Sequence, residues 1–65
     1  MTYAEAIKKL RFKMLLTQME FAQFLGVSFA SINRWETGKH EPTTKMKRKI
    51  VELCKENKIK LEVED

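Results

Sequence analysis

The sequence is short of the residues that reinforce small proteins. Its 65 residues include one cysteine, Cys54, and one histidine, His40. A disulfide needs two cysteines and a structural zinc ion needs four ligands, so neither can hold this fold together. A single cysteine is typical of a reducing compartment. With no apolar run long enough for a membrane span and no signal-peptide pattern, we expect one small cytoplasmic domain that binds no metal or cofactor.

Catalytic groups are equally scarce. His40 follows Gly38 in a loop pattern, and no serine or carboxylate is placed with it as a catalytic triad would require. We therefore expect a binding protein rather than an enzyme.

Charge is distributed unevenly along the chain. Thirteen Lys and Arg residues against nine Asp and Glu give a net charge of +4 and a pI of about 9.4. Residues 39–49 hold five of the cations and one acid, whereas residues 62–65 hold three acids and no cation. A basic body predicts a polyanionic partner such as a nucleic acid; a solvated helix face is the alternative.

Capping signals and apolar residues at helical spacing predict four helices. Each helix follows a Thr or Ser that can cap it, and in the first two a Glu three residues later completes a capping box. The expected helices span residues 3–14, 18–25, 29–36 and 45–56, capped by Thr2, Thr17, Ser28 and either Thr43 or Thr44.

The C-terminal residues follow a different pattern. Ile59, Leu61 and Val63 alternate with charged residues, which is the period of a strand. We therefore divide the chain into a domain over residues 1–56 and a tail over residues 57–65. An exposed strand edge would pair with the same strand of a second copy or bind a protein partner; a tail that lies against the bundle is the alternative.

The second and third expected helices have the spacing of a helix-turn-helix. With Gln18 as position 1, Ala22 stands at position 5 and Gly26 at position 9. Position 5 must be small because the next helix packs on it, and position 9 must accept a positive φ. Ile32 and Trp35, at positions 15 and 18, would fill the angle between the two helices.

The stretch "LTQMEFAQFLGVSFASINRWETGKHEP" resembles the Cro and lambda-repressor (XRE) family of DNA-binding regulators. The resemblance covers about residues 7–56. It implies a compact all-α bundle of four or five helices whose third helix enters the DNA major groove. The alternating tail leaves no room for the family's usual fifth helix.

The outer face of the third helix is expected to read bases. At about 100° per residue, Ile32 faces the core, and Phe29, Ala30, Asn33 and Arg34 lie on or near the opposite side. Arg34 would pair with guanine and Asn33 with adenine, while the other two would touch a thymine methyl. The alternatives are a core or interface position for Phe29 and a phosphate contact for Arg34.

Phosphate contacts form a second class of expected site. Gln18 starts the second helix, where free backbone N–H groups attract anions, and the resemblance implies a DNA-backbone contact at this residue too. For His40 a solvated loop position is the alternative. The other expected phosphate contacts are Ser28, Thr37, Lys39, His40, Thr43 and Thr44.

Other noticeable residues are expected to be structural. The resemblance implies a partly buried ion pair between Arg11 and Glu36, which ties the first helix to the end of the third. Trp35 is interpreted as a core residue rather than a stacking platform, and Cys54 as a core or boundary residue of the fourth helix.

These features predict a sequence-specific binder of double-stranded DNA that regulates transcription, as a repressor and as a homodimer on DNA. Two alternatives use the same fold. One is an antitoxin or autoregulator that binds a protein partner through residues 57–65. The other is a protein-interaction module that has lost DNA binding.

Overall fold

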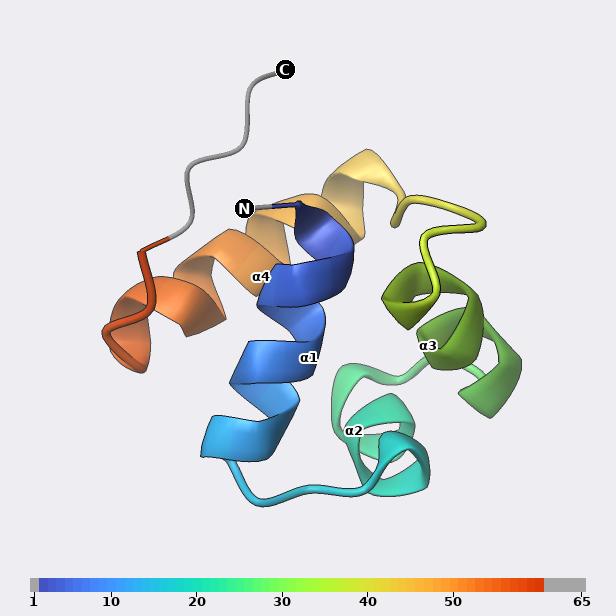
Figure 1. Ribbon diagram of the computed structural model, residues 1–65, viewed down its shortest axis with the longest axis horizontal. Coiled ribbons are helices and arrows are strands. Elements are labelled where there is room, and N and C mark those ends of the chain that lie inside the picture. Colours follow the sequence, from blue (N-terminus) through green and yellow to red (C-terminus); the bar gives the residue numbers. More distant parts are fainter. Residues whose placement is uncertain (1, 61–65) are drawn as a thin grey trace.

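The computed structural model describes residues 2–60. They form four α-helices: Tyr3–Lys13 (α1), Gln18–Leu25 (α2), Phe29–Glu36 (α3) and Thr44–Glu56 (α4). The predicted all-α bundle is confirmed, and residues 2–60 contain no strand. Helix α1 lies in the middle of the bundle, with α4 behind it and the α2–α3 pair beside it (Figure 1). None of these four helices has the length and apolar character needed to cross a membrane.

Each helix begins at the residue expected to cap it. The Thr17 hydroxyl accepts a hydrogen bond from the Glu20 N–H, and the Glu20 carboxylate accepts one from the Thr17 N–H. Thr2 and Glu5 form the same capping box at the start of α1. Of the two candidate caps of α4, the structure selects Thr43, whose hydroxyl accepts from the backbone of the first turn. Local sequence alone therefore fixes where the helices begin.

Each helix is followed within two residues by a residue with a left-handed backbone. Two of the four are glycines, Gly26 and Gly38, as expected. The other two are Leu15, with φ of 59°, and Lys58, with φ of 57°. After α1, the N–H of Leu16 donates to the Arg11 carbonyl and that of Leu15 to the Phe12 carbonyl, which is the Schellman pattern of a helix end. This turn ends α1 at Lys13, one residue before the expected boundary.

The core lies between α1 and the other three helices. Ile7 and Leu10 of α1 and Ile50 of α4 are fully buried, as their helical spacing predicts. Cys54 is buried as well, and burial raises the pKa of its thiol. The buried apolar residues are Tyr3, Ala6, Ile7, Leu10, Phe21, Ala22, Leu25, Ile32, Trp35, Ile50, Cys54 and Ile59.

The expected strand does not extend into the described part of the tail. Residues 57–60 form a turn and irregular chain rather than a strand. The N–H of Ile59 donates to the Cys54 carbonyl, and the Ile59 side chain is only 6% exposed because it closes the core beside α4. The expectation that Ile59 presents an outward apolar face is therefore wrong. Leu61 and Val63 lie outside the described residues.

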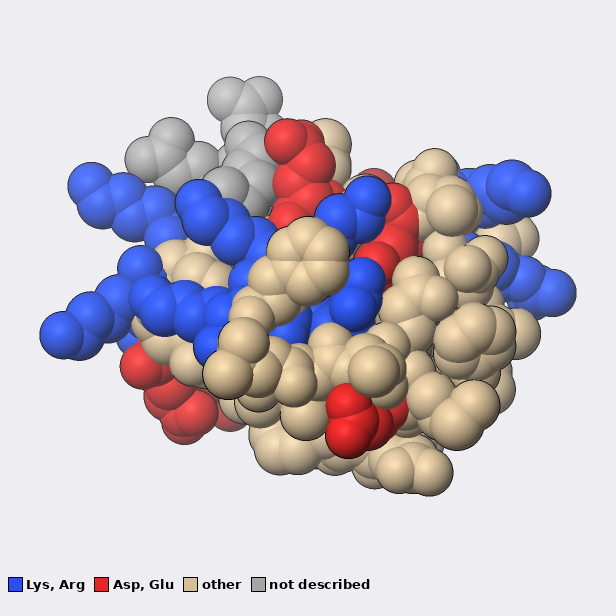
Figure 2. Space-filling view, turned by 60° about the horizontal axis from the view of Figure 1, so that its bottom comes forward, with Lys and Arg blue, Asp and Glu red and all other residues tan. Residues whose placement is uncertain are grey.

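Several large apolar side chains remain exposed where α1 meets α2. Leu15 is 89% exposed, and Phe12 and Met19 are also well exposed. Figure 2 brings this side of the molecule forward. Lys and Arg side chains gather on the left and in the centre of the view and again at its right edge, and an area with few charged side chains lies between and below them. Helical spacing does not predict this apolar corner, because it does not describe a residue, such as Leu15, that follows the helix end.

Candidate nucleic-acid interface

Helices α2 and α3 form a helix-turn-helix with the predicted geometry. Gly26 stands between them with φ of 74°, a conformation that residues other than glycine rarely adopt. Ala22 is buried, and Ile32 and Trp35 are buried on the facing side of α3. The exposed fraction of Trp35 is 8%, so this indole is a core residue rather than a stacking platform. The four residues expected to shape the motif all lie in the core or at the turn.

The outward face of α3 carries the residues expected to read bases. Ala30, Asn33 and Arg34 are exposed, and Phe29 is 48% exposed at the N-terminal end of the helix. Phe29 is therefore not a core residue of this chain. Two of these side chains are polar and two are apolar. They are therefore suited to contact the hydrogen-bonding groups and the methyl groups that base pairs present in a groove.

The expected phosphate contacts occur at three helix starts and in the α3–α4 loop. Lys39, His40 and Thr44 are exposed. The Ser28 and Thr43 hydroxyls accept hydrogen bonds from the first turns of α3 and α4. The Thr37 hydroxyl already donates its proton to backbone carbonyls of α3. It lies 3.0 Å from the Asn33 carbonyl and 3.1 Å from the Arg34 carbonyl, so only its oxygen lone pairs remain for a ligand. Among these residues, the two basic side chains of the loop are the least constrained by the fold.

Arg11 and Glu36 form the expected ion pair. The Arg11 Nε donates to Glu36 Oε2 at 2.7 Å, and its Nη2 donates to Oε1 at 3.0 Å, a two-pronged geometry. The Glu36 side chain is 2% exposed. Hydrogen bonding to this carboxylate raises the pKa of Arg11 above its ordinary value. A further bond from Nη1 to the Leu16 carbonyl ties the pair to the α1–α2 connection.

A third side chain joins this ion pair. The Nε2 atom of Gln18 donates to Glu36 Oε1 at 3.1 Å. Gln18 is the first residue of α2 and Glu36 the last of α3, so the bond links the start of one helix to the end of the next. The sequence predicts a phosphate contact for Gln18 but does not predict this bond. The resemblance supplied the arginine–glutamate pair, but nothing in the local pattern indicates which neutral residue would join it.

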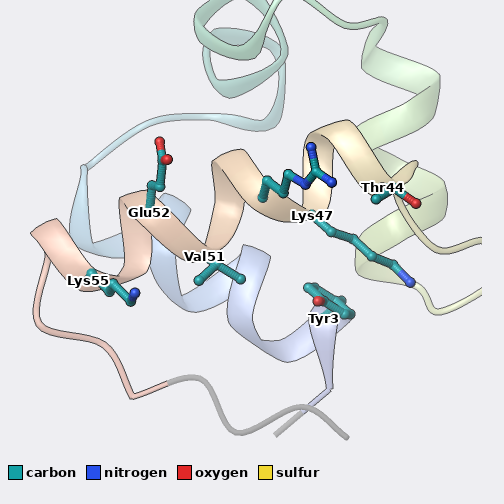
Figure 3. Close-up of a pocket in the computed structure, with 7 residues that line it drawn as sticks. Tyr3, Thr44, Lys47, Val51, Glu52 and Lys55 are labelled. Carbon is teal, nitrogen blue, oxygen red and sulfur yellow. The ribbon is translucent and has the colours of Figure 1, made fainter. Parts of the chain in front are cut away.

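A groove on another part of the surface lies between α4 and the start of α1. It has a volume of about 580 Å³ and is lined by Tyr3, Thr44, Lys47, Arg48, Val51, Glu52 and Lys55 (Figure 3). The Lys47 ammonium lies 5.0 Å from the centre of the Tyr3 ring and 2.8 Å from a Glu41 carboxylate oxygen. This cation is therefore engaged within the chain. Of the expected contact residues, the groove includes only Thr44.

The comparisons with known proteins agree with this geometry. A family model described as helix-turn-helix matches residues 7–58, well over half of the chain. The match begins in α1 and continues past the end of α4, so it covers the core as well as the motif. No curated protein and no solved structure matches the chain.

Proposed function

The chain belongs to the helix-turn-helix family of Cro and lambda-repressor-like (XRE) DNA-binding regulators, and from this premise we propose that it is a sequence-specific repressor that binds double-stranded DNA. The observation that carries the proposal is the division of α3 into two faces. Ile32, Trp35 and Glu36 are buried, while Asn33 and Arg34 are exposed between them along the helix. A helix held by one face and exposed on the other suits a major groove.

In this proposal, Arg34 pairs with a guanine and Asn33 with an adenine, and Phe29 and Ala30 contact thymine methyl groups. Phosphate contacts set the position of α3 on the duplex. Lys39 and His40 supply them after α3. The remaining contacts come from the helix starts, at Gln18, Ser28, Thr43 and Thr44. Thr37 would join them only by turning its O–H away from the Asn33 and Arg34 carbonyls, because a phosphate oxygen only accepts hydrogen bonds.

We further propose that two copies bind one operator. The contacts that one α3 of eight residues makes in one groove are too few for tight, selective binding. A two-fold pair would place two recognition helices about one turn of DNA apart, and the operator would show the corresponding repeat of half-sites.

Selection of bound sequences from random duplex DNA, followed by affinity measurements on single-base variants of the site, tests this function. Arg34→Ala is expected to lower affinity by about 1–3 kcal/mol at one base pair and little at others, because a paired base is read only where it occurs. If Arg34→Ala lowered the affinity equally for every sequence, Arg34 would contact only phosphate. Failure of the unchanged protein to enrich any sequence would refute sequence-specific binding.

Lys39→Ala is the matched control for Arg34→Ala, since each removes one exposed cation. A loop cation that contacts phosphate acts on all sequences alike. Affinity should therefore fall on every duplex, and the slope of log affinity against log salt should shrink by roughly one. Salt titrations of both variants on the selected site and on an unrelated duplex measure the difference.

One observation favours the antitoxin or autoregulator alternative. Phe12, Leu15 and Met19 leave an exposed apolar corner outside the helix-turn-helix face, and such surfaces commonly serve protein association. Both functions include DNA binding, so a repressor and an autoregulator would differ only in a protein partner. Leu15→Ser should leave DNA affinity unchanged in either case. Pull-down with the unchanged chain and with this variant would identify a partner bound through the corner.

A further inference from the structure

Glu36 binds two side chains with one carboxylate. Its Oε1 atom accepts from Arg11 Nη2 at 3.0 Å and from Gln18 Nε2 at 3.1 Å. Its Oε2 atom accepts from Arg11 Nε at 2.7 Å. The three residues come from α1, α2 and α3. The Arg11–Glu36 pair alone joins α1 to α3, so the bond to Gln18 is an additional contact that the pair does not need.

The chemistry of the bond fixes the orientation of the Gln18 amide. A carboxylate only accepts hydrogen bonds, so the NH₂ end of the amide must face Glu36 and its carbonyl end must face away. Within residues 2–60, the second N–H of this NH₂ group and the amide carbonyl have no hydrogen-bond partner. Gln18 itself is partly exposed. The amide therefore keeps one N–H donor available in a defined orientation at the start of α2.

We propose that Glu36 is a positioning residue for DNA binding: it holds the Gln18 amide so that its second N–H donates to a phosphate oxygen of the duplex. This inference rests on the proposed phosphate contact of Gln18. A phosphate oxygen only accepts hydrogen bonds, and a freely rotating amide would present its carbonyl oxygen as readily as its N–H. Fixing the side chain before binding also removes part of the entropy cost of ordering it on DNA.

Arg11 makes this arrangement compatible with a polyanion. A carboxylate near a phosphate would repel it, but the two-pronged contact with Arg11 neutralises the Glu36 charge. Gln18 is neutral, so its contact releases no counterion. Loss of the contact should therefore lower affinity on all sequences without changing the salt slope, which separates it from Lys39.

A double-mutant cycle on duplex DNA tests the proposal. The first arm is Gln18→Met, and the second is the paired change Arg11→Met with Glu36→Met, which removes one charge of each sign and replaces the ion pair by apolar side chains that folds commonly tolerate. We expect each arm to weaken binding roughly tenfold and their combination to weaken it no further. The salt slope should stay constant throughout. Gln23→Met, the same substitution at an exposed residue of α2, is the control and should bind as the unchanged chain does.

The proposal is overturned if the paired variant binds as tightly as the unchanged chain, or if its effect adds fully to that of Gln18→Met. A smaller salt slope in the paired variant would assign the loss to a direct Arg11–phosphate contact and would also overturn it. If the unchanged chain binds no duplex, the proposed function fails, and the positioning role fails with it. If the unchanged chain binds DNA but the cycle gives one of these contrary results, the proposed function stands and the positioning role alone is refuted.

Two further measurements keep the test independent of folding defects. Glu36→Asp preserves the charge opposite Arg11 but withdraws the carboxylate from Gln18 by one methylene, so it should fold and still bind DNA less tightly. In NMR spectra, the side-chain amide signals of Gln18 should move to averaged positions in Glu36→Asp while those of Gln23 stay unchanged. Unaltered Gln18 signals in this variant would show that Glu36 does not hold the amide.

Discussion

Among residues 2–60, Arg11 is the one cation that pairs with a buried carboxylate. Glu36 is the one buried charged residue among residues 2–60, and its bonds to Arg11 and Gln18 satisfy its acceptors. A buried pair of this kind adds little net stability, but removal of one partner leaves an uncompensated charge. At the scale of single residues, the Arg11–Glu36 pair is the contact with the largest expected cost of disruption.

Arg11→Met alone is expected to lower the free energy of unfolding by roughly 3–5 kcal/mol, because Glu36 would keep its charge in a buried site. Adding Glu36→Gln should recover part of the loss, since the neutral amide no longer needs a cation. Urea denaturation of the three proteins measures both effects. If each single change proved neutral, the pair would have to be accessible to solvent.

Single residues also show which parts of the site the sequence could predict. The exposure of Asn33 and Arg34 follows from helical geometry, because a helix with Ile32 in the core must turn these residues outward. The bond between Gln18 and Glu36 could not be predicted from spacing, since it depends on how the start of α2 meets the end of α3 in space. Long-range contacts between polar side chains need the fold first.

At the scale of helices, the four starts and the four ends differ in how well the sequence specifies them. The starts use Ser or Thr caps with strong sequence signals. Two of the ends use glycine, but Leu15 and Lys58 adopt left-handed backbones without a glycine signal. The end of α1 was therefore predicted less accurately than its start, and the turn that buries Ile59 was missed. The alternation over residues 59–63 predicts a strand, but Ile59 covers the core of its own chain.

Leu15→Gly is expected to raise the free energy of unfolding by about 0.5–1 kcal/mol. A left-handed backbone destabilises a residue with a Cβ by roughly 1–2 kcal/mol, and glycine removes this strain. The greater conformational freedom of glycine in the unfolded chain offsets part of the stabilisation. The Leu15 side chain is 89% exposed, so its loss removes little packing. Thermal and urea unfolding provide the measurement.

Leu15→Ala is the control for this change. It removes the same exposed side chain but retains the Cβ and hence the strained backbone, so it should leave stability close to that of the unchanged chain. A gain equal to that of glycine would mean that the exposed leucine, rather than its backbone, was unfavourable.

The two capping boxes give the helix starts a pH dependence. Hydrogen bonds from the Thr17 N–H and hydroxyl hold the pKa of Glu20 below its ordinary value of 4.5, and Thr2 does the same to Glu5. The unfolded chain therefore takes up protons first as the pH falls, so the stabilisation is present above about 4.5 and is lost as the pH drops through the lower folded-state values. Glu5→Gln with Glu20→Gln keeps both caps and removes this titration. Denaturation series between neutral and acidic pH should show a shallower acid loss in the double variant, and identical curves would contradict the assignment.

At the scale of the whole molecule, the position of Ile59 bears on how two copies meet on DNA. Because this residue serves its own core, a strand formed by the tail would have only Leu61 and Val63 for an apolar face. Short two-stranded pairs are marginal in water even with more apolar contact. We therefore propose that association depends on DNA rather than on strand pairing.

Sedimentation of the full chain and of a version ending at Lys60 tests this proposal. The shorter version retains Ile59 in the core, whereas a cut at Asn57 would damage the fold and confuse the result. Both proteins should be monomers without DNA, and both should bind the selected operator as two copies. If only the shorter version sedimented with a lower mass or bound the operator less tightly, the tail would be the dimerisation segment.

The caps and terminal turns of all four helices are formed by residues close in sequence, which favours rapid folding. Each helix has a capping start within three residues and a left-handed turn at its end, so much of its hydrogen bonding forms between neighbours in sequence. Chains dominated by such local contacts have low contact order, and small helical bundles of this kind fold within microseconds to milliseconds. A molecule that opens would refold faster than a protease could cleave it, so its rate of proteolysis would follow the equilibrium population of the open form rather than the rate of opening.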